Sequence, residues 1–270
     1  MKLTRRKLRI FRKFLEKSRQ IKQEYPNYNV FKAIISSKYR RFYYKKFDNR
    51  NNKYYIQIAK ERGYLLSPNS PPDLFKEILI ERIYDVKGFT PKENDVVVDV
   101  GAYYGDSAIW WAKEFRAKVI AFEPLKKAYK EMLKNIKLNH VERLIKAYNV
   151  ALGSGKTILG GTNKGTMFGI TSKERKIKTK TLDSFNLRKV DILKIDVEGF
   201  EYDVLLGAIE TIKRTKPKII LEAHSKELRR ECEEILKSLN YELKVEGRKV
   251  ESNSPGFDTV QNLFYEFCRS

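Results

Sequence analysis

The sequence has few of the residues that mark several large protein classes. It contains 2 cysteines, Cys232 and Cys268, and 2 histidines among 270 residues. The cysteines lie far apart and lack the short spacing of a zinc site, so we expect reduced thiols, as in a cytoplasmic protein. No apolar run approaches the roughly 20 residues that span a bilayer. The basic start is not followed by an apolar segment, which argues against a secretory signal.

Acidic residues are scarce in one part of the chain only. Residues 1–60 carry 19 Lys and Arg against 3 Asp and Glu, whereas residues 61–270 carry 37 against 31. Aromatic residues lie between these charges, so the segment is too apolar for a simple disordered tail. Helical spacing predicts helices over 3–21 and 30–47. We expect residues 1–72 to form a basic helical extension. Its residues 1–60 are expected to bind an anionic membrane surface or nucleic acid, or to pack on the chain's own core; the oligomeric state stays open.

A break in the helical pattern at 49–52 and a proline-rich stretch at 67–73 precede a domain predicted over 73–270. There, β-branched runs alternate with helical segments, as in a doubly wound α/β fold. Strands are predicted at 96–100, 119–123, 144–152, 190–196, 218–223, 241–245 and 260–267, a hairpin at 153–171, and helices at 74–84, 126–138, 200–212 and 227–239. The pattern predicts a Rossmann-like, seven-stranded, mostly parallel sheet with helices on both faces, closed by an antiparallel pair.

The first predicted strand leads into a loop with two glycines, Gly101 and Gly105, and the next strand ends on Glu123. Ligands of open parallel sheets bind beyond the carboxyl ends of the strands, where a glycine turn exposes backbone N–H groups. Glu123 could accept hydrogen bonds from both hydroxyls of a ribose. The dinucleotide fingerprint G-x-G-x-x-G has one more glycine than this loop, which argues against a dinucleotide cofactor. The loop, with Asp99 two residues before the first glycine, instead resembles the S-adenosylmethionine site of class I methyltransferases.

Four further ionisable side chains follow two later strands. Asp196 and Glu198 come after one strand, and Glu222 and His224 end the next. Strand period predicts that both pairs lie at the same edge as the glycine loop. Such a group suits acid–base or metal-assisted chemistry, although helix capping and ion pairs are alternative roles for the acids. We expect Glu201 to be a first-turn helix acid that binds the preceding loop.

An ordered set of motifs from about residue 96 to residue 224 resembles the FkbM family of class I methyltransferases. The motifs are Asn149-Val-Ala-Leu152, Thr181-Leu-Asp183, Lys194-Ile-Asp-Val-Glu-Gly-Phe-Glu201 and the E-x-H strand end at 222–224. The resemblance implies methyl transfer from S-adenosylmethionine to a hydroxyl, often on a sugar, a glycan or a small natural product. Phe200 is bulky where the family usually has a small residue, which alters the shape of the site.

These residues and the resemblance predict two groups of site residues. The cofactor-binding group is Asp99, Gly101, Ala102, Tyr103, Gly105, Asp106, Glu123, Pro124, Asn149, Val150 and Asp196. The catalytic group is His224, as the first candidate base, with Asp196, Glu198 and Glu222. The same four residues are the candidate ligands for a divalent metal.

Two other functions stay open. One is an RNA methyltransferase acting on ribose or base, because the basic segment suits phosphates and stacked bases. The strand end lacks the motif of Asp or Asn followed by Pro-Pro and an aromatic residue, which argues against methylation of base amino groups. The second is an inactive basic binding module on the same fold. We expect a cytoplasmic protein, with peripheral membrane contact as an alternative.

Overall fold

The computed structural model describes residues 15, 17–23, 51–160, 175–248, 250–251 and 259–268, and the chain divides into two compact units, residues 1–62 and 63–270. In the first unit, residues 15, 17–23 and 51–61 are helical. The predicted helix over 30–47 lies outside the described residues. The predicted break at 49–52 is wrong at Asn51 and Asn52, which are helical; the run that follows them contains good helix formers.

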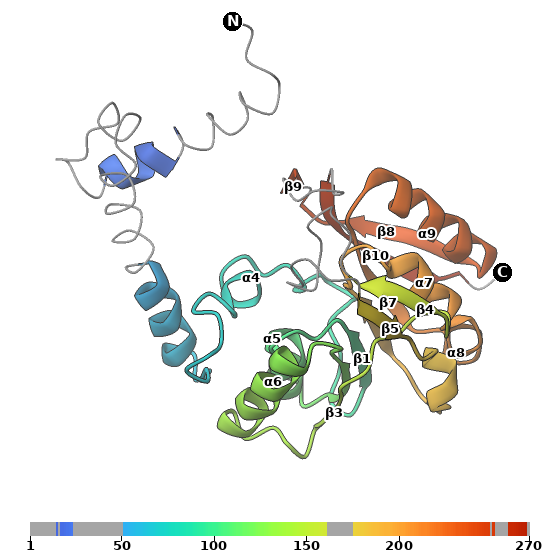
Figure 1. Cartoon of the computed structure of the whole chain (residues 1–270), viewed down its shortest axis with the longest axis horizontal. Coiled ribbons are helices and arrows are strands. Elements are labelled where there is room, and N and C mark those ends of the chain that lie inside the picture. Colours follow the sequence, from blue (N-terminus) through green and yellow to red (C-terminus); the bar gives the residue numbers. More distant parts are fainter. Residues whose placement is uncertain are drawn as a thin grey trace, which may run out of the picture. The chain divides into compact units, whose positions relative to one another are not determined.

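The second unit is built on one mixed sheet (Figure 1) with the strand order β3-β2-β1-β6-β7-β10-β8, and β9 pairs with β10. The strands are β1 (Val96–Val100), β2 (Lys118–Phe122), β3 (Ile145–Tyr148), β6 (Ile192–Ile195), β7 (Lys218–Ala223), β8 (Tyr241–Glu246), β9 (Val250–Glu251) and β10 (Thr259–Phe267). The first five are parallel, while β10 runs antiparallel to β7 and β8. The predicted seven-stranded, mostly parallel sheet with a closing antiparallel pair is confirmed; β9 adds a two-residue pairing.

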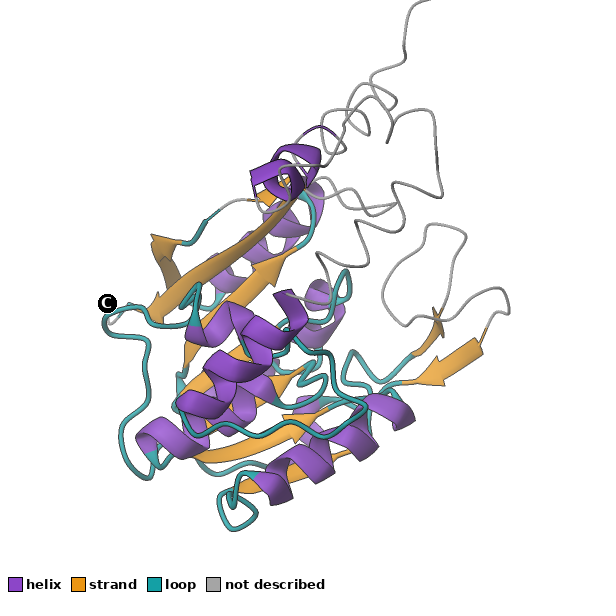
Figure 2. Ribbon diagram, turned by 90° about the vertical axis from the view of Figure 1, so that its left-hand side faces the viewer, coloured by secondary structure: helices purple, strands orange, loops and turns teal. Residues whose placement is uncertain are grey.

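Helices cover both faces of this sheet (Figure 2) because successive side chains of a strand point to opposite sides. The helices are α4 (Lys76–Leu79), α5 (Asp106–Phe115), α6 (Lys126–Leu138), α7 (Glu201–Leu206), α8 (Ile209–Thr215) and α9 (Lys226–Ser238). Val98 and Val100 of β1 belong to the hydrophobic core that α7, α8 and α9 cover. Asp99 points to the other face, where the Ser107 hydroxyl of α5 donates to it at 2.6 Å.

Two predicted helices are wrong in extent. The helix predicted over 200–212 is interrupted at Gly207, between α7 and α8. A Cβ on Gly207 would lie 1.9 Å from the carbonyl oxygen of Gly153, so the chain crossing at this point requires glycine. The helix predicted over 74–84 is limited to the four residues of α4, and Arg82 beyond it has a φ of 55°, which a right-handed helix does not allow.

The region after β2 also differs from the sequence prediction. The strand predicted over 144–152 ends at Tyr148, where the Asn149 side chain turns to bind backbone carbonyls of residues 123 and 124. The arms of a hairpin are present as β4 (Thr157–Gly160) and β5 (Arg175–Lys178), which pair antiparallel. Residues 161–174 between them lie outside the described part of the chain.

The proline-rich stretch, which belongs to the second unit, is hydrogen-bonded to α6. The backbone N–H of Ser67 donates to Asn135 Oδ1 at 2.7 Å, and its hydroxyl donates to Glu131 Oε2 at 2.6 Å. Asn135 Nδ2 donates in turn to Ser70 Oγ and to the carbonyl oxygen of Tyr104, in the glycine loop. Residues 67–70 therefore help to fix α6 and that loop. Within the described residues, no helix is both long and apolar enough to cross a membrane.

Candidate functional site

The loop after β1 approaches the end of β6 very closely. Gly101 has a φ of 83°, and a Cβ at this position would lie 1.8 Å from the carbonyl oxygen of Asp196. The N–H groups of Gly101 and Ala102 both donate to the carbonyl oxygen of Phe122 at 3.0 Å. Gly105 has a φ of 91° and is the N-cap of α5. Glycine at 101 thus lets the ends of β1, β2 and β6 meet in one narrow region.

Glu123 follows β2 and its side chain faces the glycine loop. It is 5 % exposed, and its two carboxylate oxygens accept the N–H groups of Tyr103 at 2.9 Å and Leu125 at 2.7 Å. A carboxylate offers about four acceptor positions, so two N–H groups leave room for a pair of hydroxyls. Burial raises the pKa of Glu123 to about 7, although the N–H groups of Leu125 and Tyr103 act to lower it.

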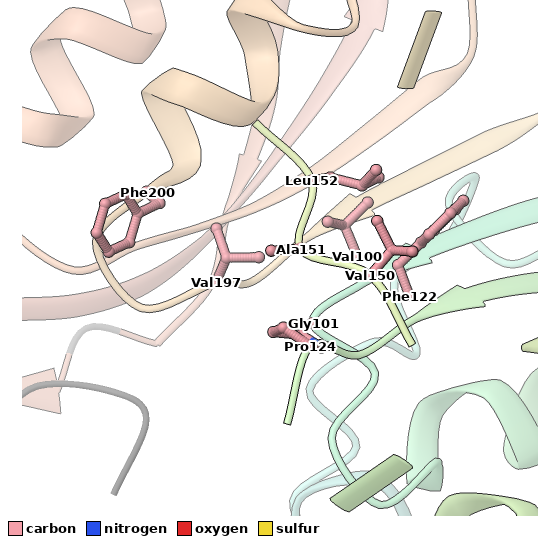
Figure 3. Close-up of a pocket in the computed structure, with 9 residues that line it drawn as sticks. All are labelled: Val100, Gly101, Phe122, Pro124, Val150, Ala151, Leu152, Val197 and Phe200. Carbon is pink, nitrogen blue, oxygen red and sulfur yellow. The ribbon is translucent and has the colours of Figure 1, made fainter. Parts of the chain in front are cut away.

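An apolar hollow has Phe122 and Pro124, the two sequence neighbours of Glu123, in its wall (Figure 3). Its volume is about 300 Å³, part of which is open to solvent. It lies at the carboxyl ends of β1 and β2, next to the segments that follow β3 and β6. Its lining residues are Val100, Gly101, Phe122, Pro124, Val150, Ala151, Leu152, Val197 and Phe200. Three of the predicted cofactor residues, Gly101, Pro124 and Val150, are therefore in its wall. A concave apolar wall beside one buried carboxylate is typical of small-molecule sites.

The other predicted cofactor residues surround this hollow in different ways. Asn149 is exposed and donates to the backbone carbonyls of Glu123 and Pro124, at 2.8 and 3.0 Å. Tyr103 is 47 % exposed on the glycine loop, whereas Ala102 is buried. Asp106 is the first residue of α5, and burial raises its pKa to about 7. Direct contact of these side chains with a cofactor stays a prediction.

Asp99 lies beneath the loop in a buried ion pair that the sequence analysis missed. Its carboxylate is fully buried, and Oδ1 lies 3.0 Å from Nζ of Lys194. Lys194 Nζ also donates to the carbonyl oxygen of Gly101 at 3.2 Å and lies 3.4 Å from Asp196 Oδ2. Burial acts to lower the pKa of Lys194, but Asp99, Tyr84 and Asp196 outweigh it and the pKa is well above its usual value. Lys194 thus connects the glycine loop to the catalytic group.

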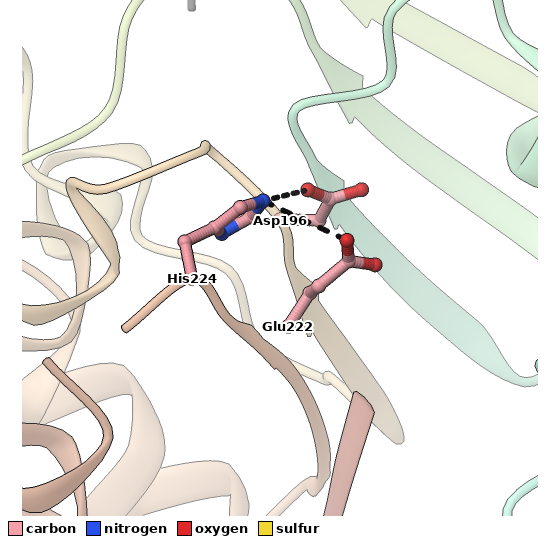
Figure 4. Close-up of side chains that lie close together, drawn as sticks. All are labelled: Asp196, Glu222 and His224. Carbon is pink, nitrogen blue, oxygen red and sulfur yellow. Dashed lines mark ion pairs between the residues drawn. The ribbon is translucent and has the colours of Figure 1, made fainter. Parts of the chain in front are cut away.

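Three of the four predicted catalytic side chains come together at the ends of β6 and β7 (Figure 4). His224 Nε2 lies 3.6 Å from Glu222 Oε1 and 4.0 Å from Asp196 Oδ1. We call Asp196, Glu222 and His224 the imidazole–carboxylate cluster. Glu198 is exposed, with a φ of 48°, and does not belong to this group. Its side chain is therefore placed at the rim of the site.

Glu201 contacts the second ring nitrogen of His224, Nδ1. It is fully buried, and its Oε1 lies 3.0 Å from His224 Nδ1. The same carboxylate accepts the N–H groups of Val197 and Gly199 at 3.0 to 3.2 Å, so the predicted contact with the preceding loop is confirmed. The contact with His224 was not predicted, because it joins residues 23 positions apart on different elements.

Negative charge dominates the electrostatics of the cluster. Burial acts to lower the pKa of His224, but the hydrogen bond to Glu201 and the charges of Glu201, Asp196 and Glu222 raise it to about 9. The pKa of Glu222 is raised by burial and by Asp196. These negative charges favour a positive charge on His224, so its imidazole is a stronger base than a free one.

Comparison with known proteins identifies the family. Residues 99–243, just over half of the chain, match the methyltransferase FkbM domain. The chain belongs to the FkbM methyltransferase family. The family match starts at Asp99 and extends past His224, so it covers all of the predicted site residues. The methyltransferase activity inferred from the motifs is thereby supported.

Relatives and solved structures of similar kind are known. Methyltransferase 1 of Beauveria bassiana (strain ARSEF 2860) is 25% identical over 187 residues, which cover 56% of this chain and 74% of that protein. Methyltransferase sdnD of Sordaria araneosa is 24% identical over 197 residues, covering 57% and 75%. A crystal structure of methyltransferase FkbM from Methylobacillus flagellatus KT has a TM-score of 0.46 and 18% identity, with coverage of 80% and 60%.

The residues of this FkbM protein fit S-adenosylmethionine, the cofactor of the family. The glycine loop has no space for a side chain at Gly101, because a Cβ there would meet the carbonyl oxygen of Asp196. Glu123 supplies a buried carboxylate, and the hollow supplies apolar walls for a ring system. The chain is thus a methyltransferase of the S-adenosylmethionine-dependent type.

Proposed function

We propose that this FkbM methyltransferase methylates a hydroxyl oxygen on a sugar, a glycan or a small natural product. The observation that supports the proposal is the position of the imidazole–carboxylate cluster next to the apolar hollow. Val197 and Phe200 line the hollow, while Asp196, only one residue before Val197, belongs to the cluster. Groups that bind the cofactor and groups that act on an acceptor therefore share one short loop.

Methylation of a hydroxyl makes a specific chemical demand. S-Adenosylmethionine supplies an electrophilic methyl group on a sulfonium and leaves as a neutral thioether. A neutral alcohol is a weak nucleophile, so its oxygen has to lose the proton as the new C–O bond forms. That proton is the only one that the protein needs to move. Asp196, Glu222 and His224 offer acceptors for it within one small volume.

The roles of the individual groups follow from their positions. His224 is the first candidate base, because Glu201 holds its Nδ1 and directs Nε2 toward Glu222 and Asp196. A divalent ion held by the cluster would serve the same purpose by lowering the pKa of the acceptor hydroxyl. Glu198, at the exposed rim, is available to hydrogen-bond a polar acceptor.

A nucleic-acid acceptor is the second candidate. The observation that favours it is the excess of 19 Lys and Arg over 3 Asp and Glu in residues 1–60. We propose that this segment binds an anionic partner, either RNA or an anionic membrane surface at the cytoplasmic side. Deletion of residues 1–60 is expected to remove salt-sensitive binding to RNA or anionic liposomes while the affinity for S-adenosylmethionine is kept.

An acceptor screen tests the proposed reaction. The full chain is incubated with S-adenosylmethionine and, separately, with sugars, glycans, hydroxylated natural products and RNA, and S-adenosylhomocysteine is measured. We expect turnover with a hydroxyl-bearing small molecule or glycan. His224→Gln should lose this turnover, whereas Glu142→Gln, an exposed carboxylate after α6, should keep it. Turnover with RNA alone would assign the second candidate, and cofactor binding without any turnover would support the inactive module.

A further inference from the structure

The imidazole–carboxylate cluster has the donor atoms of a metal site. Asp196, Glu222 and His224 each offer one ligand atom, and these three atoms all lie within 4.8 Å of one another. Figure 4 shows one imidazole nitrogen turned toward both carboxylates, at 3.6 and 4.0 Å. Two ligands at about 2.1 Å from one ion in octahedral geometry are roughly 3 Å apart. Small side-chain rotations would therefore bring all three atoms onto a single ion.

A contact outside the cluster orients the histidine donor. Glu201 is fully buried, and its Oε1 is 3.0 Å from His224 Nδ1. Glu201 is itself fixed by the N–H groups of Val197 and Gly199. A carboxylate on the second ring nitrogen is the usual partner of a metal-binding histidine, because it sets the tautomer and directs the other nitrogen at the ion.

A second outside contact orients the aspartate donor. Lys194, which is almost completely buried, lies 3.4 Å from Oδ2 of Asp196 and 3.0 Å from Oδ1 of Asp99. The other oxygen of Asp196, Oδ1, is the one that faces His224. Each of these two donors thus has one atom held by the protein and another directed into the cluster.

The local charge also favours a cation. Four carboxylates, Asp99, Asp196, Glu201 and Glu222, lie within one connected set of contacts with Lys194 and His224. This set therefore contains more acidic than basic side chains. Asp99 and Glu201 are fully buried, so water compensates little of this excess.

We propose that Asp196, Glu222 and His224 bind a divalent cation of the Mn²⁺ class, with Glu201 as the residue that positions His224. Two carboxylate oxygens and one imidazole nitrogen suit such an ion, and three protein ligands leave positions for water and an acceptor oxygen. The binding site follows from the geometry alone, whereas its use in catalysis depends on the proposed hydroxyl methylation. Glu198, although nearby in sequence, is not a ligand in this arrangement.

Titration of the full chain with Mn²⁺ tests the site without any methyl acceptor. Free Mn²⁺ is followed by electron paramagnetic resonance, and spin-echo modulation reports a coordinated imidazole nitrogen. We expect one tight ion per chain with this nitrogen signature. Glu222→Gln and His224→Gln should each weaken binding at least tenfold, and His224→Gln should remove the signature. Glu201→Gln should weaken binding roughly 10- to 100-fold while the signature stays. Glu142→Gln, which removes an exposed carboxylate after α6, is the matched control, with affinity near that of the unchanged chain.

The controls separate loss of the site from loss of the fold. Each variant is also titrated with S-adenosylmethionine, which should bind with unchanged affinity. Absence of saturable Mn²⁺ binding, or equal weakening by Glu142→Gln and Glu222→Gln, would overturn the proposal. Full hydroxyl methylation in a strong chelator would overturn the ion's catalytic use and leave the proposed function intact. Mn²⁺ binding as expected, together with methylation of nitrogen only, would support the site and refute the proposed function.

Discussion

Replacement of Glu123 by glutamine should weaken cofactor binding and change how protein stability depends on pH. The carboxylate is 5 % exposed, and burial raises its pKa from 4.5 to about 7. A hydrogen bond from a cofactor hydroxyl to a charged acceptor contributes about 1.5–3 kcal/mol. Loss of that charge should therefore weaken S-adenosylmethionine binding roughly 10- to 150-fold at pH 8.

The effect on stability depends on pH. Because the pKa of Glu123 is higher in the folded than in the unfolded chain, its proton stabilises the fold below about pH 4.5, and this contribution is lost as the pH rises through about 7. The difference between these two pKa values corresponds to roughly 3 kcal/mol. The free energy of unfolding of Glu123→Gln, relative to the unchanged chain, should thus increase by up to about 3 kcal/mol between pH 5 and pH 8.

Two assays check the pair of effects. Calorimetric titration with S-adenosylmethionine gives the affinity, and urea unfolding at pH 5 and pH 8 gives the stability difference. Glu142→Gln, which removes an exposed carboxylate, should change neither quantity. Unchanged cofactor affinity in Glu123→Gln would refute the ribose contact. A stability difference that is the same at both pH values would refute the buried charge.

Three further results are expected. Gly101→Ala should lower the free energy of unfolding, measured in urea, much more than Gly88→Ala does. Both residues have positive φ, which costs an alanine about 1–2 kcal/mol, but only the Cβ at 101 meets a backbone oxygen, which adds about 1–3 kcal/mol. Equal losses in the two variants would refute this explanation. Lys194→Met should lower the free energy of unfolding by about 3–5 kcal/mol, because it leaves Asp99 without its ion pair. The double variant Lys194→Met with Asp99→Leu should regain part of this stability, and no regain would contradict the ion pair. His224→Gln should lower kcat/KM roughly 10²–10⁴-fold without changing the Kd of S-adenosylmethionine; a parallel loss of cofactor affinity would place His224 in the cofactor site instead.

The sheet could be predicted from the sequence because its signals are local. Each parallel strand of the centre is a short β-branched or apolar run followed by a helical segment, and the chain order of these runs determines the α/β class. The helix over 126–138 was also predicted with its observed bounds. The interruption at Gly207 was not, because a single glycine is tolerated in many helices and only the contact with Gly153 excludes a side chain there.

The candidate site could be predicted only in part. The alternation of side chains along a strand and the order of the strands predict which side chains lie at the carboxyl edge of the sheet. For this reason Asp196, Glu222 and His224 could be predicted to lie together. A signal for the ion pair beneath them was present: Lys194 interrupts an apolar central strand, and its neighbour in the register of β1 and β6 is Asp99. A charge in a buried strand needs a partner. The contact of Glu201 with His224 had no local signal, because it depends on how α7 packs against the end of β7.

The atom that receives the methyl group tests the central conclusion most directly. The full chain is supplied with S-adenosylmethionine that carries a carbon-13 methyl group, together with the acceptor found in the screen, and the product is examined by carbon-13 NMR. We expect the label in an O–CH₃ group, and no label with His224→Gln. A labelled N–CH₃ or C–CH₃ group, or equal labelling by His224→Gln, would contradict hydroxyl activation by the imidazole–carboxylate cluster.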